Sequence, residues 1–117
     1  MMKQYTSKDQ TPKLIELGFP KPQGWGDASI SNKWVMAISP NGKREDFNYS
    51  IGELIEFLPT SFSKKDKYFR LDIFPARSGW FILYATYNKE EYHRNFEREL
   101  IDALFCACVT LKEEGMI

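Results

Sequence analysis

The sequence predicts an α+β domain, in which an antiparallel sheet of about four strands, arranged as two hairpins, is combined with three helices in the order α-ββ-α-ββ-α. Three observations lead to this prediction. The C-terminal segment repeats apolar residues at helical spacing, Tyr68 to Tyr87 contains two strand-like runs separated by turn residues, and a Ser-x-x-Glu capping signal begins a short helix at Ser50. The length of 117 residues is usual for one domain, so residues 1–117 are expected to form a single α+β domain.

The N-terminal part predicts a short helix. Either Ser7-x-x-Gln10 or Thr11-Pro12 supplies the start, and the sequence leaves both alternatives open. Gly18 marks the end, with Phe19 folding back as in a Schellman cap.

A first hairpin is expected from Trp34 to Tyr49, because Asn41-Gly42 is a strong signal for a two-residue turn. Its second strand carries few apolar residues and suits an edge position. The preceding segment, Lys21 to Asn32, is rich in Gly, Ser and Asn and predicts the longest loop.

The middle of the chain predicts a helix followed by a second hairpin. Ser50 and Glu53 have the spacing of a capping box, and Pro59 ends the run. From Tyr68 to Phe74 apolar and polar residues alternate, as in a half-buried strand. The run from Trp80 to Tyr87 is apolar or aromatic almost throughout, which predicts a central strand covered on both faces.

The last segment predicts an amphipathic helix from about Arg94 to Glu114, with Gly115 as its end. Its two cysteines, Cys106 and Cys108, lie two residues apart, and therefore about 200° apart around the helix axis. Side chains that diverge in this way do not form a disulfide with each other or bind one metal ion. We therefore expect a structural helix and no cysteine site.

Composition bears on partners and location. Sixteen Lys and Arg balance sixteen Asp and Glu, so the net charge is zero, which disfavours nucleic acid as a partner. The cluster Lys64, Lys65 and Lys67 is interpreted as a solvated loop. The N-terminus shows no signal peptide and no apolar run has transmembrane length, so we expect a cytoplasmic protein without membrane association.

Four segments form a recognisable pattern: a first helix in LIELGFPKP, a second in YSIGELIEFLP, the aromatic strand from Trp80, and the ending ELIDALFCACVTLKEEGMI. In this pattern the chain resembles a family of small uncharacterised proteins from bacteriophages, prophages and mobile elements of bacteria. The resemblance covers most of the chain except Lys21 to Lys43. It implies an accessory role in that genomic setting, and it brings no activity, cofactor or catalytic residue.

No catalytic pattern is present in the sequence. The single histidine, His93, lies in a polar segment before the last helix, and no Ser or Thr sits in a nucleophile elbow. The Gly24 to Gly26 segment lacks the strand-glycine-helix context of a nucleotide site. We therefore expect no catalytic, metal-binding or cofactor-binding residues, and a non-enzymatic protein.

Aromatic residues make up 15% of the chain, and they suggest a partner surface in addition to a core. The candidate residues are Trp25 in the loop, Trp80 beside the turn, and Tyr68, Arg70 and Phe74 on the outward face of their strand. The sequence thus predicts a protein that binds another protein, self-association being the simplest case. The alternative is a single-stranded nucleic-acid-binding module that stacks bases on strand aromatics beside Arg70 and the three lysines.

Overall fold

A computed structural model describes residues 3–22 and 48–117 of the chain. These residues form three helices and a four-stranded antiparallel sheet, which confirms the predicted α+β class. The helices are α1 (Gln10–Glu16), α3 (Ile51–Phe57) and α4 (Leu100–Glu113), and the strands are β1 (Ser61–Lys64), β2 (Lys67–Ala76), β3 (Gly79–Ala85) and β4 (Glu91–Glu97). The predicted first hairpin falls almost entirely outside the described residues, as does nearly all of the predicted Lys21 to Asn32 loop.

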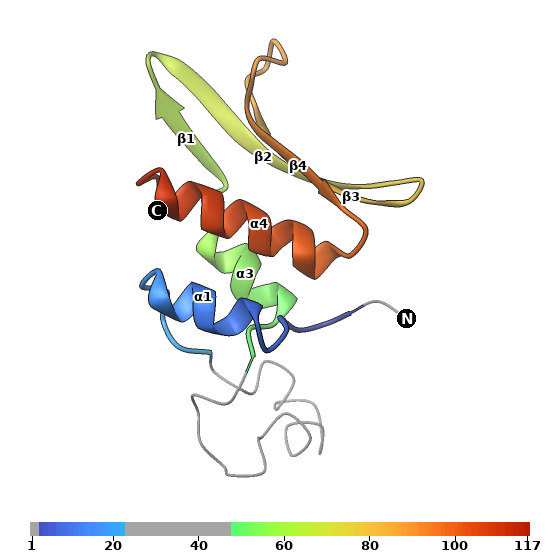
Figure 1. Ribbon diagram of the computed structural model, residues 1–117. Coiled ribbons are helices and arrows are strands. Elements are labelled where there is room, and N and C mark those ends of the chain that lie inside the picture. Colours follow the sequence, from blue (N-terminus) through green and yellow to red (C-terminus); the bar gives the residue numbers. More distant parts are fainter. Residues whose placement is uncertain (1–2, 23–47) are drawn as a thin grey trace.

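The sheet is a meander with strand order β1-β2-β3-β4, each strand antiparallel to its neighbours. Helix α4 packs on β3 and β4, and α3 packs on α4. Figure 1 shows the resulting layers: the sheet, then α4, then α3 and α1, with all three helices on the same side of the sheet. One face of the sheet is therefore covered by helix.

The core lies between this face and the helices. Seven residues of α4 are buried, among them Ile101, Leu104 and Leu111, which are fully inaccessible to solvent. From the sheet, Phe69, Ile82 and Tyr84 point into the same core. The apolar residues that alternate along β2 and the apolar stripe of the last helix, both predicted from the sequence, therefore pack in the same core. Each set lies on one face of its element because its spacing matches the period of a strand or of a helix.

Two buried tyrosines anchor the core through polar contacts at their hydroxyl groups. Tyr84 donates to the carbonyl of Pro59 over 2.7 Å, and Tyr49 donates to the carbonyl of Pro20 over 2.6 Å. Burial raises the pKa of Tyr49 to about 12, with the charge of Glu53 as a smaller cause. Both hydroxyls accordingly remain protonated donors, which is how buried tyrosines are usually satisfied.

Local signals in the sequence fix the helix ends. The Ser50–Glu53 capping box is present at the start of α3. Before α1 the reciprocal bonds of the first predicted alternative run between Ser7 and Gln10, over 2.9 and 3.2 Å, although the helix itself begins at Gln10 and the side chain of the preceding Asp9 makes no capping bond. Gly18, with φ +100°, closes α1 by a Schellman motif, in which the Phe19 amide donates to the Leu14 carbonyl.

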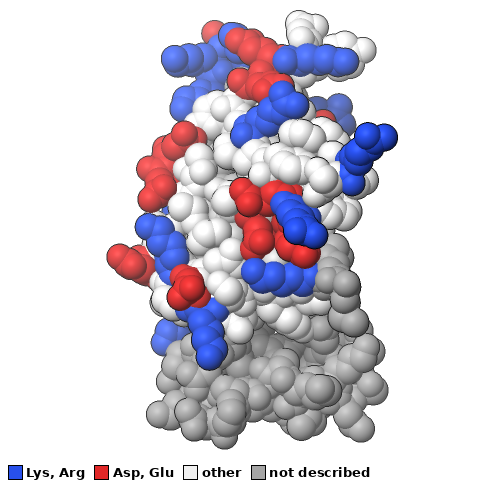
Figure 2. All heavy atoms as spheres, turned by 45° about the vertical axis from the view of Figure 1, so that its right-hand side comes forward, with Lys and Arg blue, Asp and Glu red and all other residues white. Residues whose placement is uncertain are grey.

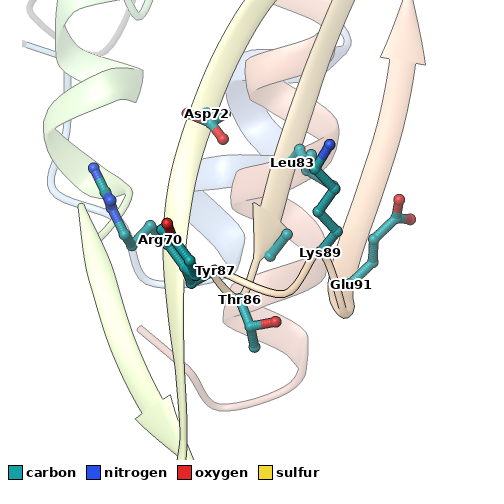
Figure 3. A pocket seen from close by; sticks show the side chains of 8 residues that line it. Arg70, Asp72, Leu83, Thr86, Tyr87, Lys89 and Glu91 are labelled. Atoms are coloured by element: carbon teal, nitrogen blue, oxygen red, sulfur yellow. The ribbon is translucent and has the colours of Figure 1, made fainter.

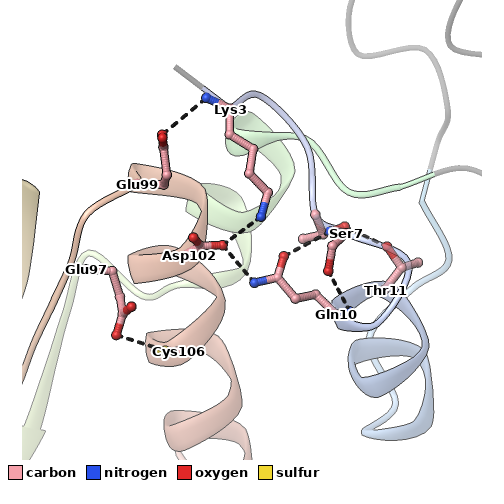
Figure 4. Close-up of polar contacts among 9 residues, drawn as sticks. Lys3, Ser7, Gln10, Thr11, Glu97, Glu99, Asp102 and Cys106 are labelled. Atoms are coloured by element: carbon pink, nitrogen blue, oxygen red, sulfur yellow. Dashed lines mark hydrogen bonds and ion pairs between the residues drawn. The ribbon is translucent and has the colours of Figure 1, made fainter. Parts of the chain in front are cut away.

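The N-terminal segment is attached to α4 by polar contacts. Figure 4 shows Lys3 and Gln10 converging on Asp102, at 3.0 and 2.8 Å from the same carboxylate oxygen. The backbone amide of Lys3 also donates to Glu99, at 3.2 Å. These contacts hold α1 beside the first turns of α4.

The predicted start of the last helix at Arg94 is wrong. Residues 94–97 belong to strand β4, where Arg94 pairs with Leu83 and Phe96 pairs with Phe81, and the helix begins only at Leu100. The segment satisfies helical spacing by its sequence alone, but hydrogen bonding to β3 determines its conformation. His93 lies in the same strand and contacts Asn95.

The lysine cluster is also more ordered than a solvated loop. Lys64 and Lys67 are paired residues of β1 and β2, and Lys65 and Asp66 form the two-residue turn between them. Both turn residues have positive φ, +52° and +64°, as in the primed turns that suit the twist of a hairpin. The lysines remain exposed, and Lys67 forms an ion pair with Glu90.

Candidate interaction surface

The second face of the sheet presents its side chains away from the three helices. Strand pairing places directly opposed residues on the same face, so the register defines this set, and a bulge after Tyr84 brings Glu91 opposite Ala85. We call it the open face, and its members are Ser61 and Ser63 of β1, Tyr68, Arg70, Asp72 and Phe74 of β2, Phe81, Leu83 and Ala85 of β3, and Glu91, Arg94 and Phe96 of β4.

Three phenylalanines form a row across the open face. Phe74, Phe81 and Phe96 stand opposite one another on adjacent strands, with ring centroids 5.2 Å apart for the first pair and 4.8 Å for the second. Phe74 and Phe96 are each 38% exposed, and the guanidinium of Arg94 lies 5.0 Å from the Phe81 ring centroid. Because each ring packs against its neighbour, the row is a preformed apolar surface.

Gly79 makes room for this row. A Cβ atom at this position would lie 2.6 Å from Cζ of Phe96 and closer still to the carbonyl oxygen of Glu97. Glycine at the start of β3 therefore allows the Phe96 ring and the end of β4 to approach the strand closely.

The other half of the open face is charged and hollowed. A groove of about 410 Å³ is lined there by Arg70, Asp72, Leu83, Ala85, Thr86, Tyr87, Lys89 and Glu91. Figure 3 shows that these residues come from β2, β3, β4 and the turn between β3 and β4. Tyr87 in that turn is 91% exposed. Two cations and two carboxylates line the groove, so it has mixed charge.

The charges of the open face are only partly paired within the chain. Arg94 lies 3.6 Å from Glu91, which is the ion pair found on this face. Among residues 3–22 and 48–117, Arg70 and Asp72 form no ion pair. Figure 2 shows the same mixture on the side of the molecule in view, where Lys and Arg stand beside Asp and Glu without an extended region of one sign.

The sequence-predicted surface residues divide into three groups. Tyr68, which is 56% exposed, Arg70 and Phe74 lie together on the open face as expected. Trp80 lies on the opposite face of the sheet, where it is half-buried and packs against the core, because it shares the phase of Ile82 along β3. Trp25 lies outside the described residues.

Sequence reasoning missed Phe81, Leu83, Phe96 and Tyr87. The interpretation of β3 as covered on both faces concealed its outward residues, and Phe96 was assigned to the last helix. One signal was available: across the two-residue turn of Arg77 and Ser78, alternate residues of β3 starting at Phe81 lie on the same face of the sheet as Phe74. The hairpin register alone would have placed them on one face.

The cysteines offer no reactive pair. Both thiols are free, and the Sγ atoms have separate partners: Cys106 lies 3.9 Å from Glu97 (Figure 4), whereas Cys108 is fully buried and lies 3.6 Å from the carbonyl of Leu54. Burial raises the pKa of Cys106, with Glu97 and Asp102 adding to the effect, and burial raises the pKa of Cys108 to about 12. Both groups are therefore thiols at neutral pH.

Metal-binding clusters and membrane-spanning helices are both lacking in the described part of the chain. There, no group of three or more His, Cys, Asp or Glu residues is placed to hold a metal ion, and no helix has the length and apolarity needed to cross a membrane. Comparisons with protein-family models, with curated proteins and with solved structures gave no significant match.

Proposed function

We propose that this protein acts by binding another protein chain through the open face, without catalysing a reaction. The supporting observation is the row of Phe74, Phe81 and Phe96, which a twisted sheet holds in contact and which remains partly exposed. Large rings that are already ordered lose little conformational entropy on binding, and such residues commonly supply most of the energy of an interface.

The surroundings of this row support a protein partner. Asp72 and Arg94 adjoin the aromatic row on one side, and Arg70 and Glu91 lie one row farther along the strands, so an apolar part of the face lies beside a charged part. Interfaces between proteins likewise combine apolar contacts with charged and polar groups at their rim. The carboxylates of Asp72 and Glu91 would repel a phosphate backbone, so a protein fits this face better than a nucleic acid.

Variants of exposed rings test the proposal. Phe74→Ala and Phe96→Ala remove two rings of the row, and Ile55→Ala on α3 is a matched control, since Ile55 is 39% exposed and lies on the helical side. The resemblance to phage and mobile-element proteins makes a bacterial extract the first source of a partner. Immobilised protein should retain a chain that, once identified and purified, binds wild type and Ile55→Ala equally and each Phe variant at least about tenfold more weakly.

Two outcomes would contradict the proposal. One is equal binding of the purified chain by all four proteins. The other is binding of single-stranded oligonucleotide that falls steeply with salt and is lost in the Phe variants, which would assign the face to nucleic acid.

A further inference from the structure

The charges and rings of the open face follow an order that specifies one occupant. Across β2, β3 and β4 the register forms three rows, which are Arg70–Ala85–Glu91, Asp72–Leu83–Arg94 and Phe74–Phe81–Phe96. The first row reads positive, neutral, negative, the second reads negative, neutral, positive, and the third is aromatic throughout. In each charged row, the residue on β2 therefore has the opposite charge to the residue on β4. In the aromatic row, the residues on β2 and β4 are the same.

We infer that the open face packs against the open face of a second copy of this chain, about a two-fold axis parallel to β3; this inference rests on the proposed function and names its partner. Such an axis keeps each row in place and exchanges β2 with β4. Arg70 then faces Glu91 of the second copy, Asp72 faces Arg94, and Phe74 faces Phe96. The β3 residues lie near the axis, where Phe81 and Leu83 each meet their own equivalents.

The alternative two-fold axis, which lies in the sheet plane across the strands, does not give this match. It would reverse the order of the rows and place the first row on the third, so that Arg70 would be buried against Phe74 of the second copy without a carboxylate, while Asp72 and Arg94 would each face their own equivalents. Burying an unpaired charge is costly, whereas opposite charges at the edge of an interface fix its register. The sequence therefore selects the axis along β3.

Sheet geometry permits this arrangement. Two sheets that pack face to face keep their strands within about 30° of each other at a separation of about 10 Å. A two-fold axis between them bisects the crossing angle, so strand twist and symmetry are compatible. Among the described residues, Arg70 and Asp72 lack an ion-pair partner in the single chain, and the second copy supplies one for each.

The size of the face sets the strength of association. The three strands that face each other in this arrangement, at about seven residues each, span roughly 14 by 23 Å, or roughly 330 Å². This is about two-fifths of the ~800 Å² per partner of a standard stable interface. We therefore expect a weak dimer, whose population rises with protein concentration.

Charge reversal tests the two-fold arrangement. In Arg70→Glu both edge pairs of the first row become Glu facing Glu, and in Glu91→Arg both become Arg facing Arg. Each variant alone should therefore dimerise at least about tenfold more weakly than wild type in sedimentation equilibrium. An equimolar mixture of the two should recover dimers. In the mixed dimer the introduced glutamate of the first variant faces the introduced arginine of the second, and the unchanged Arg70 of the second faces the unchanged Glu91 of the first.

Recovery of dimers in the mixture would show that each variant is folded and that it fails to dimerise alone because its charges no longer match. Glu56→Arg, a charge reversal at an exposed position of α3, is the control and should sediment as wild type. A wild-type protein that remains monomeric at about 1 mM, or a mixture that remains monomeric, would overturn the two-fold dimer. If, with that result, Phe74→Ala still abolished binding of a different identified chain, the open face would remain a protein-binding surface and only self-association would be excluded.

Discussion

Replacing Gly79 by alanine should destabilise the fold, although it adds a single methyl group. The new Cβ would lie 2.6 Å from Cζ of Phe96, 3.0 Å from Cα of Arg98, and closest of all to the Glu97 carbonyl oxygen. Two of these three atoms belong to the backbone that connects β4 to α4. Rotation of the Phe96 ring would relieve only one contact, so the connection itself must move.

The size of the loss in stability depends on which atoms must move to make room for the methyl group. Overpacking by a methyl group in a well-packed site typically costs about 1 to 3 kcal/mol, and the involvement of two backbone atoms places Gly79→Ala in the upper part of that range. For a domain of this length, each 1 kcal/mol corresponds to roughly 4 °C in melting temperature. We therefore expect a decrease of roughly 8 to 12 °C.

Urea unfolding followed by circular dichroism would measure this loss, with Gly52→Ala as the control. Gly52 lies in helix α3, and a Cβ there would meet only the Ser50 hydroxyl oxygen at 3.9 Å. Alanine should leave that site unstrained and stabilise the helix by up to about 0.5 to 1 kcal/mol. If Gly79→Ala unfolded within about 0.3 kcal/mol of wild type, the β4–α4 connection would be loose, and the reasoning from close approach would be refuted.

Three further predictions concern the core, a turn and a thiol. Leu104→Ala should cost about 2 to 5 kcal/mol in urea unfolding, because Leu104 is fully buried at the centre of α4; a loss under half a kilocalorie would mean that α4 packs loosely. Exchanging Lys65-Asp66 for Asn-Gly should raise the free energy of unfolding by about 0.5 to 1 kcal/mol, since both residues have positive φ; an unchanged or lower value would show that the turn is not strained. Because burial raises the pKa of Cys108 from 9.0 to about 12, the folded thiol keeps a proton that the unfolded chain loses above about pH 9. The contribution of this thiol to stability is therefore complete below about pH 9 and declines by up to about 1.4 kcal/mol per pH unit above it. Between about pH 8 and about pH 11, the free energy of unfolding of Cys108→Ala should therefore fall less steeply with pH than that of wild type. Equal pH dependence in the two proteins would contradict a raised pKa for Cys108.

Local sequence determined the features that depend on a few neighbouring residues. The capping pairs at Ser50 and Ser7, the glycine ends of α1 and α4, and the hairpin turn between β2 and β3 all follow from short-range hydrogen bonds or from allowed φ values. The separation of Cys106 from Cys108 follows from helix geometry in the same way. These signals need no knowledge of the rest of the fold.

Tertiary structure decided the features that depend on pairing between distant segments. The segment containing Phe96 matches helical spacing, yet the hydrogen bonds of β3 make it a strand, and Lys64 joins a strand because Lys67 lies opposite. Whether Trp80 is buried or exposed likewise depends on which face of the sheet α4 covers. Alternation along a strand assigns residues to two faces, but it does not say which face is buried. The open face exists only because four strands are held in one register, and no single strand contains its pattern of charges and rings.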